Sequence, residues 1–342
     1  MMDTGKRATQ SLGAPPDRMP RSVRRTSSLQ SSWPDGVERP LLMQGTARDL
    51  FTADPPAPPA VIGTEALNVR LDAGKRIVAI DGSRAPQALA GFMGLRPGGE
   101  MRRAVNATMP GEAAESSLLH RLLDDMPGAS FMAGAAWVPW AEAGIDHYNA
   151  ATGQPLSAGR DVTDVCIGFA RGSGTVRDNG APRIDLQKHA IAPPPLREDD
   201  PFAWHDFVTE TGPNHRRTRR MDLWREGRRL AVNAEFQDSV GLPDRLDARL
   251  IFHEYRLDAT LDADSLVLED IRVAAAVLPY PACLAAPDTA RRLIGLPVTQ
   301  LRAAVPATLP GAAGCTHLND VLRALQDLAG LAVLLDGCVT GA

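Results

Sequence analysis

The same short text occurs twice in this chain of 342 residues, 200 positions apart. The first copy, from Arg103 to Gly111, reads Arg-Ala-Val-Asn-Ala-Thr-Met-Pro-Gly, and the second, from Ala303 to Gly311, reads Ala-Ala-Val-Pro-Ala-Thr-Leu-Pro-Gly. A shared Val-x-Ala-Thr-x-Pro-Gly within matching flanks indicates an internal duplication, which restricts the chain to architectures built from two like units. We therefore expect two related halves that pack about a pseudo-two-fold axis, as the subunits of a homodimer do.

Each half is expected to place its strands before its helices. In the second half, apolar segments on either side of Glu226–Arg229 predict a hairpin, and an apolar stripe after Cys315 or Thr316 predicts an amphipathic helix. The expected strands lie at 221–225, 230–236, 250–261 and 266–277, and the expected helices lie at 288–295, at 299–305 and from about 315 onward. The first half follows this order in a weaker form, so the sequence predicts an α+β fold.

Composition divides the chain into four segments. Residues 1–40 are rich in arginine, serine and proline and are expected to form a disordered tail, because they offer little apolar surface to bury. Residues 41–185 are the first, degenerate half, and residues 213–342 are the second half, which carries the candidate site. The stretch between them, 186–212, contains Pro193–Pro195 and is expected to be a linker.

Net charge, hydropathy and cysteine spacing exclude several classes of protein and of binding partner. A formal net charge of −4 gives no general attraction to nucleic acid or to an anionic membrane. The chain contains no apolar run of the roughly 18–20 residues that span a bilayer. Its four cysteines are too few and too widely spaced for a disulfide framework. We expect a soluble cytoplasmic protein with a small-molecule substrate and the option of a homo-oligomer.

The candidate site lies where the two halves differ. The second half is longer than the first ahead of the repeated text, and its additional residues include Tyr280 and Cys283. Cys315 and His317 stand where the first half has a glutamate and a serine. Because one copy of a duplicated unit can diverge towards function, these four residues are the expected catalytic group.

Several chemistries fit this group. A thiolate at a helix start beside an imidazole would be a nucleophile. Cys283, Cys315 and His317 could bind zinc, with His253 or His215 as the fourth ligand. Without a metal or another cofactor, Tyr280 and His317 could exchange protons. In a purely structural role, the thiols would be small buried groups and the imidazole would bond the helix start.

Other side chains are expected to bind substrate. Guanidinium groups in the dense run 215–220 could hold a carboxylate or phenolate, although such a run also suits an edge strand protected from aggregation. Indole rings could stack on an aromatic substrate. The expected binding residues are His215, Arg216, Arg217, Arg219, Trp137, Trp140, Trp224 and His253.

Three motifs carry a family resemblance over about residues 204–331. The Arg-rich run 215–220, the segment Pro279–Cys283 and the segment Gly314–Leu318 resemble the domain-of-unknown-function 2889 family, and the text from about residue 42 is similar to that of its longer members. The resemblance implies a part in the breakdown of plant-derived aromatic compounds, including cofactor-free release of formaldehyde from lignin-type dimers.

We therefore expect a cofactor-independent lyase that acts on a small hydroxylated aromatic compound, for example by releasing formaldehyde from a lignin-derived dimer. One alternative is a metal-dependent hydrolase or hydratase that holds zinc at the Cys/Cys/His group. Another is a non-catalytic protein that binds a small molecule or serves in assembly.

Overall fold

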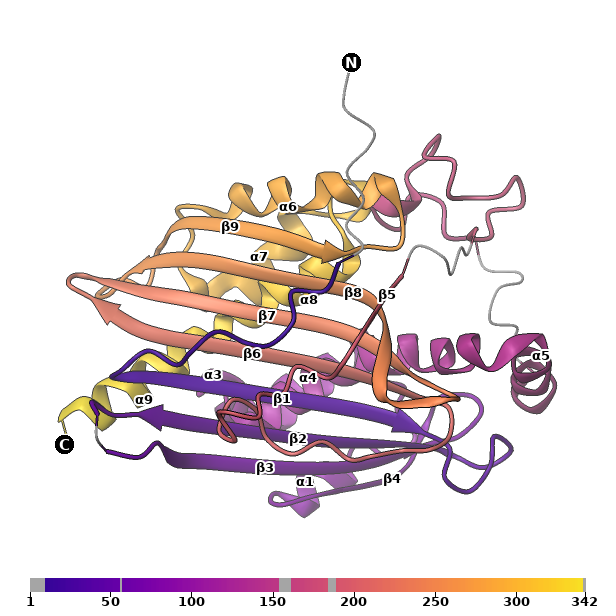
Figure 1. Ribbon diagram of the computed structural model, residues 1–342, viewed down its shortest axis with the longest axis horizontal. Helices are drawn as coiled ribbons and strands as arrows, with labels where there is room; N and C mark the ends of the chain where they lie inside the picture. The colour runs from indigo at the N-terminus through magenta and orange to yellow at the C-terminus, as the bar shows by residue number, and fades with distance from the viewer. Residues whose placement is uncertain (1–9, 56, 154–160, 184–188, 341–342) are drawn as a thin grey trace.

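One large antiparallel sheet organises the computed structural model, which describes residues 10–55, 57–153, 161–183 and 189–340 (Figure 1). The strand order is β4-β3-β2-β1-β6-β7-β8, and both β5 and β9 pair with β8. The strands are β1 (Ser22–Ser32), β2 (Leu41–Thr52), β3 (Ala60–Leu71), β4 (Ile77–Gly82), β5 (Ala190–Ala192), β6 (Asn214–Glu226), β7 (Arg229–Leu242), β8 (Arg245–Asp262) and β9 (Leu268–Val277).

Most of the helices pack on one face of this sheet, behind the strands in Figure 1, whereas the helix Ala141–Thr152 lies beyond the ends of the strands. The α-helices are α1 (Pro86–Ala90), α2 (Gly99–Thr108), α3 (Pro110–Ala114), α4 (Leu118–Met132), α5 (Ala141–Thr152), α6 (Ala286–Thr289), α7 (Leu301–Thr308), α8 (Thr316–Ala324) and α9 (Leu328–Thr340). The 3₁₀-helices are η1 (Ala133–Trp140), η2 (Ile167–Phe169), η4 (Pro281–Ala285), η5 (Ala290–Leu293), η6 (Val298–Gln300), η7 (Gly311–Ala313) and η8 (Leu325–Asp327). The α+β class predicted from the sequence is confirmed.

The strands of the second half follow the expected order. A hairpin joins β6 to β7 through Gly227, whose positive φ of 61° suits the glycine that the turn requires. The apolar stripe predicted for the amphipathic helix extends through α8, η8 and the start of α9. Its members, Leu318, Val321, Leu322, Leu325 and Leu328, are all buried against the sheet. The helix expected at 288–295 is formed by α6 followed by η5, and the helix expected at 299–305 begins as η6 and continues as α7 through Pro306 to Thr308.

The two ends of the sheet share a set of backbone hydrogen bonds. In the first half, Ile77 N donates to Leu95 O (2.9 Å) and Gly94 N donates to Ile77 O (2.8 Å). In the second half, Leu268 makes the same pair of bonds with Leu296 and Gly295, at the same two lengths. Both segments therefore return to the edge of the sheet through the same kind of turn.

The expected disordered tail is wrong for residues 22–32, because they form the buried central strand β1 between β2 and β6. Its first nine residues lie outside the described part. Composition misleads here because the polar side chains of β1 find fixed partners. Arg24 forms an ion pair with Asp222 on β6, and Arg25 forms one with Asp49 on β2. Buried guanidinium groups that are paired and hydrogen bonded can replace an apolar strand.

The second face of the sheet is covered by chain rather than by helices. An N-terminal segment crosses in front of the central strands, and part of the predicted linker does so as well (Figure 1). Within that linker, β5 pairs with β8, and the buried ring of His205 lies between Thr26 and Ser28, with ring nitrogens 2.9 and 2.7 Å from their hydroxyl oxygens. Among the described helices, none combines the length and apolar content needed to cross a membrane.

Candidate functional site

A fully buried carboxylate, Asp238 on β7, is the centre of the candidate site. Arg217 donates two hydrogen bonds to it, from Nε to Oδ1 (2.9 Å) and from Nη2 to Oδ2 (2.8 Å). His215 Nε2 lies 3.1 Å from Oδ1, and His317 Nε2 lies 3.8 Å from Oδ2. One guanidinium and two imidazoles therefore share a single carboxylate.

Strand periodicity and register assemble these groups. Residues two apart on a strand point to the same face, so His215 and Arg217 both face the helices. Arg217 is the register partner of Asp238 across β6 and β7, and Asp238 is in turn the register partner of His253 on β8. A register shift after Asp238 changes the pairing there, and such irregularities often redirect a side chain at a site.

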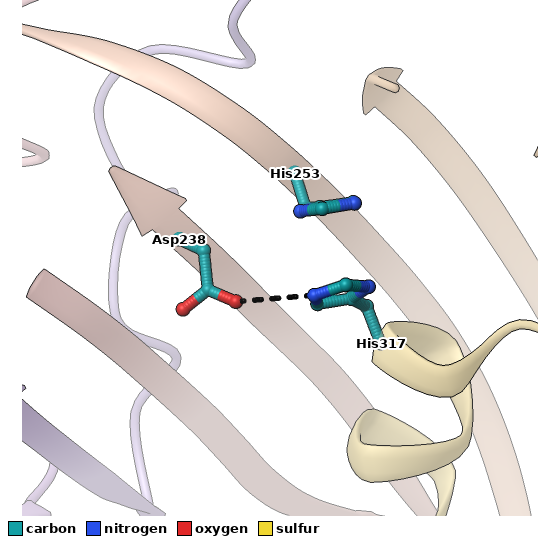
Figure 2. Close-up of side chains that lie close together, drawn as sticks. All are labelled: Asp238, His253 and His317. Atoms are coloured by element: carbon teal, nitrogen blue, oxygen red, sulfur yellow. Dashed lines mark ion pairs between the residues drawn. The ribbon is translucent and has the colours of Figure 1, made fainter. Parts of the chain in front are cut away.

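Helix α8 supplies the last member of the site. His317, in its first turn, lies face to face with His253, with ring centroids 3.5 Å apart and planes inclined by 17°. Figure 2 shows His317 reaching from the helix so that its ring lies against the ring of His253 and its edge faces the Asp238 carboxylate. His253 is buried, and its Nδ1 has no hydrogen-bond partner among the described residues. His317 is 13% exposed and is the more accessible of the two rings.

The surroundings keep both stacked rings neutral and the carboxylate ionised. Burial lowers the pKa of His317 to about 4, although Asp238 opposes the change. Burial and the neighbouring His317 lower the pKa of His253. Burial alone would raise the pKa of Asp238, but the guanidinium of Arg217 holds it well below its usual value. At neutral pH the site thus combines two unprotonated bases with a negative charge.

Arg217 itself is fixed by further acids. Its Nη1 lies 3.0 Å from Asp320 on α8 and 3.9 Å from Asp125 on α4. It also passes so close to α4 that a Cβ on Gly128 would lie 1.8 Å from Nη1. The glycine therefore makes room for the guanidinium, which in turn orients Asp238.

A second group beside this centre consists of three thiols and two tyrosines: Cys166, Cys283, Cys315, Tyr255 and Tyr280. Cys315 at the start of α8 lies 3.3 Å from the hydroxyl of Tyr255, which is two residues beyond His253 on β8. Burial raises the pKa of Cys315 and of Cys283, whose charged forms would repel each other. Burial also raises the pKa of Tyr280, to about 12. These groups stay protonated at neutral pH.

The structure separates the predicted site residues into several places. His215, Arg217, His253 and His317 meet at Asp238, whereas Tyr280, Cys283 and Cys315 belong to the thiol–tyrosine group. The other predicted residues lie elsewhere: Arg219 pairs with Asp125, Arg216 points to the opposite sheet face, Trp137 packs on Trp33 and Tyr148, Trp140 precedes α5, and Trp224 donates to Glu226 near the β6–β7 turn.

Sequence reasoning missed Asp238, Tyr255 and Cys166. The predicted strand ended at Phe236, whereas β7 continues to Leu242 and so includes Asp238 on the same face as Phe236. A lone aspartate in phase with buried apolar residues was the available signal. Cys166 gave no such signal, because it lies in a loop far from the other thiols in sequence.

One carboxylate and two imidazoles come close enough together to hold a single metal ion. Ligand atoms of Asp238, His253 and His317 all lie within 4.8 Å of one another. Among the described residues, Cys283, Cys315 and His317 do not form such a group. Two imidazoles and a carboxylate are common zinc ligands. A metal here would nevertheless have to share Asp238 with Arg217 and His215.

Comparisons with known proteins give one finding. No curated protein and no solved structure matches the chain. Residues 215–330 match the family model DUF2889, described as a protein of unknown function. The resemblance predicted from the sequence is thereby confirmed over this part of the chain, and the part that matches the DUF2889 family contains every residue of the Asp238 centre.

Proposed function

We propose that this protein is a cofactor-independent lyase that acts on a small hydroxylated aromatic compound, with His317 and His253 as its acid–base pair. The observation that carries the proposal is the face-to-face contact of these two neutral imidazoles, 3.5 Å apart, beside the ionised Asp238. Sites of proton transfer concentrate groups whose pKa values are shifted in this way.

The proposed reaction needs proton transfer but no electron carrier. A base removes the proton of a hydroxymethyl O–H, the adjacent C–C bond breaks, and formaldehyde leaves as its C=O forms. The electron pair of the broken bond passes to the substrate carbon, which takes a proton back from the imidazolium. Atoms and charges balance, and a positioned acid–base group contributes about 10²–10⁴-fold in rate.

Exposure assigns the roles within the pair. His317 is the partly exposed ring and therefore exchanges the proton with the substrate. Asp238, 3.8 Å from its Nε2, stabilises the imidazolium that forms, as a buried carboxylate does beside a catalytic histidine. His253, the buried member of the pair, stacks on the other face of the His317 ring. Tyr280, half-buried and protonated, remains a candidate donor to the developing negative charge.

The thiols support acid–base chemistry over nucleophilic attack. A catalytic cysteine needs an environment that lowers its pKa, because the thiolate is the reactive form. Burial instead raises the pKa of Cys166, Cys283 and Cys315. A covalent mechanism through these thiols is therefore the weaker hypothesis.

A metal-dependent hydrolase or hydratase is the second candidate function. It is favoured by the mutual approach of Asp238, His253 and His317 within 4.8 Å and by the unpartnered Nδ1 of His253. Elemental analysis of protein purified without chelators separates the candidates. A content below about 0.2 metal ions per chain removes the metal-dependent one.

Formaldehyde release from a lignin-type dimer that carries a hydroxymethyl group tests the first candidate. We expect His317→Gln to lower kcat by about 10²–10⁴-fold. We also expect the variant to lose the pH dependence of kcat that the histidine causes. His147→Gln is the matched control, because that histidine is 55% exposed and lies away from Asp238. Full turnover by His317→Gln would remove the assignment.

We also propose that the two halves arose by duplication and are related by a pseudo-two-fold axis between β1 and β6. The pair Arg25–Asp49 on β1 and β2 occupies the place that Arg217–Asp238 occupies on β6 and β7. A homo-oligomer and a cytoplasmic location stay predictions. An experimental structure whose halves superpose by a rotation of about 180° would support the duplication, and halves of different topology would contradict it.

A further inference from the structure

Two buried guanidinium groups have no acidic partner on the sheet face opposite Asp238. Arg216 and Arg249 are 5% and 7% exposed, and neither forms an ion pair with any residue that the structure describes. Arg249 donates to Ser239, from Nε to the hydroxyl (2.9 Å) and from Nη2 to the carbonyl (3.2 Å). Arg216 donates from Nε to Gln30 (2.9 Å) and from Nη2 to the carbonyl of Val208 (2.7 Å). The Nη1 group of each donates to none of the residues that the structure describes.

The two cations lie next to each other. Arg216 is the register partner of Ser239 across β6 and β7, and Arg249 bonds to that same serine. Burial and the charge of Arg216 together lower the pKa of Arg249. The ring of Phe207 covers one side of Arg216, 4.4 Å from its Cζ atom. Burial lowers the pKa of Arg216 to about 10, and the acid that opposes this change, Glu210, is not within ion-pair distance.

Strands β1 and β6 provide an internal comparison. Arg24 on β1 faces Asp222 on β6, and the two form a buried ion pair with two hydrogen bonds, of 2.6 and 2.8 Å. Arg216 on β6 faces Gln30 on β1 in the reciprocal position, so an amide stands where the other pair has a carboxylate. The amide accepts a hydrogen bond but supplies no charge.

Buried charges are normally paired, because an isolated one is costly to remove from water. We infer that Arg216 and Arg249 form a second ligand site, which binds the oxyanion of a small molecule, a carboxylate or a phosphate group. Two adjacent guanidinium groups with free Nη1 donors match the planar, multidentate geometry of such oxyanions. This site does not depend on the proposed function, because it lies on the other face of the sheet from His317.

Thermal unfolding of the full-length protein in different anions tests the inference. Sodium phosphate and sodium benzoate are each titrated against sodium chloride at equal ionic strength, so that screening is constant. We expect a saturable rise in Tm of about 3–5 °C with at least one of the two oxyanions. A response to phosphate alone identifies a phosphate ligand, and a response to benzoate alone identifies an aromatic carboxylate. No saturable response to either anion refutes the site.

Variants decide whether the response comes from these residues. Gln30→Glu places a carboxylate beside Arg216 and should abolish the rise in Tm. Arg249→Gln should lower the apparent affinity for the anion at least tenfold. Arg245→Gln, an exposed arginine on the same strand, should leave it unchanged. If Gln30→Glu fails to fold, Arg249→Gln still gives the answer. An undiminished rise in both Gln30→Glu and Arg249→Gln overturns the inference.

Discussion

Replacing Asp238 by asparagine should destabilise the protein far more than the loss of one ion pair at the surface. The substitution keeps the size of the side chain but removes its charge from between Arg217 and His215. Arg217 donates to both carboxylate oxygens, at 2.9 and 2.8 Å. An asparagine can accept only one of these bonds and would turn its own NH₂ group towards the second donor.

The magnitude follows from what remains around Arg217. Removing one partner of a buried ion pair costs about 3–5 kcal/mol, because the other charge stays buried without compensation. Here Asp320 still lies 3.0 Å from Nη1 and retains part of the compensation. We therefore expect a loss at the lower end, about 3 kcal/mol in the free energy of unfolding.

Urea denaturation followed by circular dichroism measures this loss. The matched control is Asp247→Asn, since Asp247 pairs with Arg245 at the surface, where the two side chains are 75% and 54% exposed. Exposed pairs contribute about 0–1 kcal/mol. Equal m-values would show that both variants unfold from comparable states. A loss for Asp238→Asn within 1 kcal/mol of the control would refute the claim that this carboxylate neutralises a buried guanidinium.

Two further predictions concern stability. Burial lowers the pKa of His317 to about 4 and that of His205 to about 3, below the unfolded value near 6.5. Their contribution to stability is therefore complete above about pH 6.5 and is lost on acidification towards pH 4, by roughly 3 kcal/mol for each histidine. Urea midpoints measured across this pH range would show the loss, and a midpoint that does not change with pH would contradict it. Gly128→Ala should lower the free energy of unfolding by about 3 kcal/mol or more, because the new Cβ would lie 1.8 Å from Arg217. The control Gly337→Ala on α9 meets nothing within 4 Å and should raise the free energy of unfolding by about 0.5–1 kcal/mol. Equal urea midpoints for the two variants would contradict this explanation.

The elements that the sequence predicted well are those whose partners are close in the chain. The β6–β7 hairpin and the apolar stripe that begins on α8 follow from local periodicity, in which apolar residues recur every second or every third to fourth position. β1 has no such pattern, because its buried positions include arginine, threonine and serine. Arg24 reaches its carboxylate 198 residues away, so nothing near it in sequence marks it as buried.

The candidate site was predictable only in part, for a related reason. His253 and His317 were recognised by residue type, but they lie together only because the start of α8 packs on β8 and brings the two rings into contact. The cysteines were predicted to be reactive groups. They are instead buried, and Cys315 has Tyr255 rather than a base as its partner. A single sequence does not reveal how burial changes the pKa of an imidazole or of a thiol. That property depends on packing between distant segments.

The arginine run 215–220 illustrates how alternation gives neighbouring residues different roles. A strand sends successive side chains to opposite faces, so a cluster in sequence becomes two separate groups in space. On the helix face, Arg217 meets Asp238 and its charge is neutralised. On the other face, Arg216 meets Gln30, and its charge is not. Predicting one binding patch from the whole run therefore merged Arg217, which is paired with Asp238, with Arg216, for which we propose a ligand. Only the partner across the strand distinguishes the two.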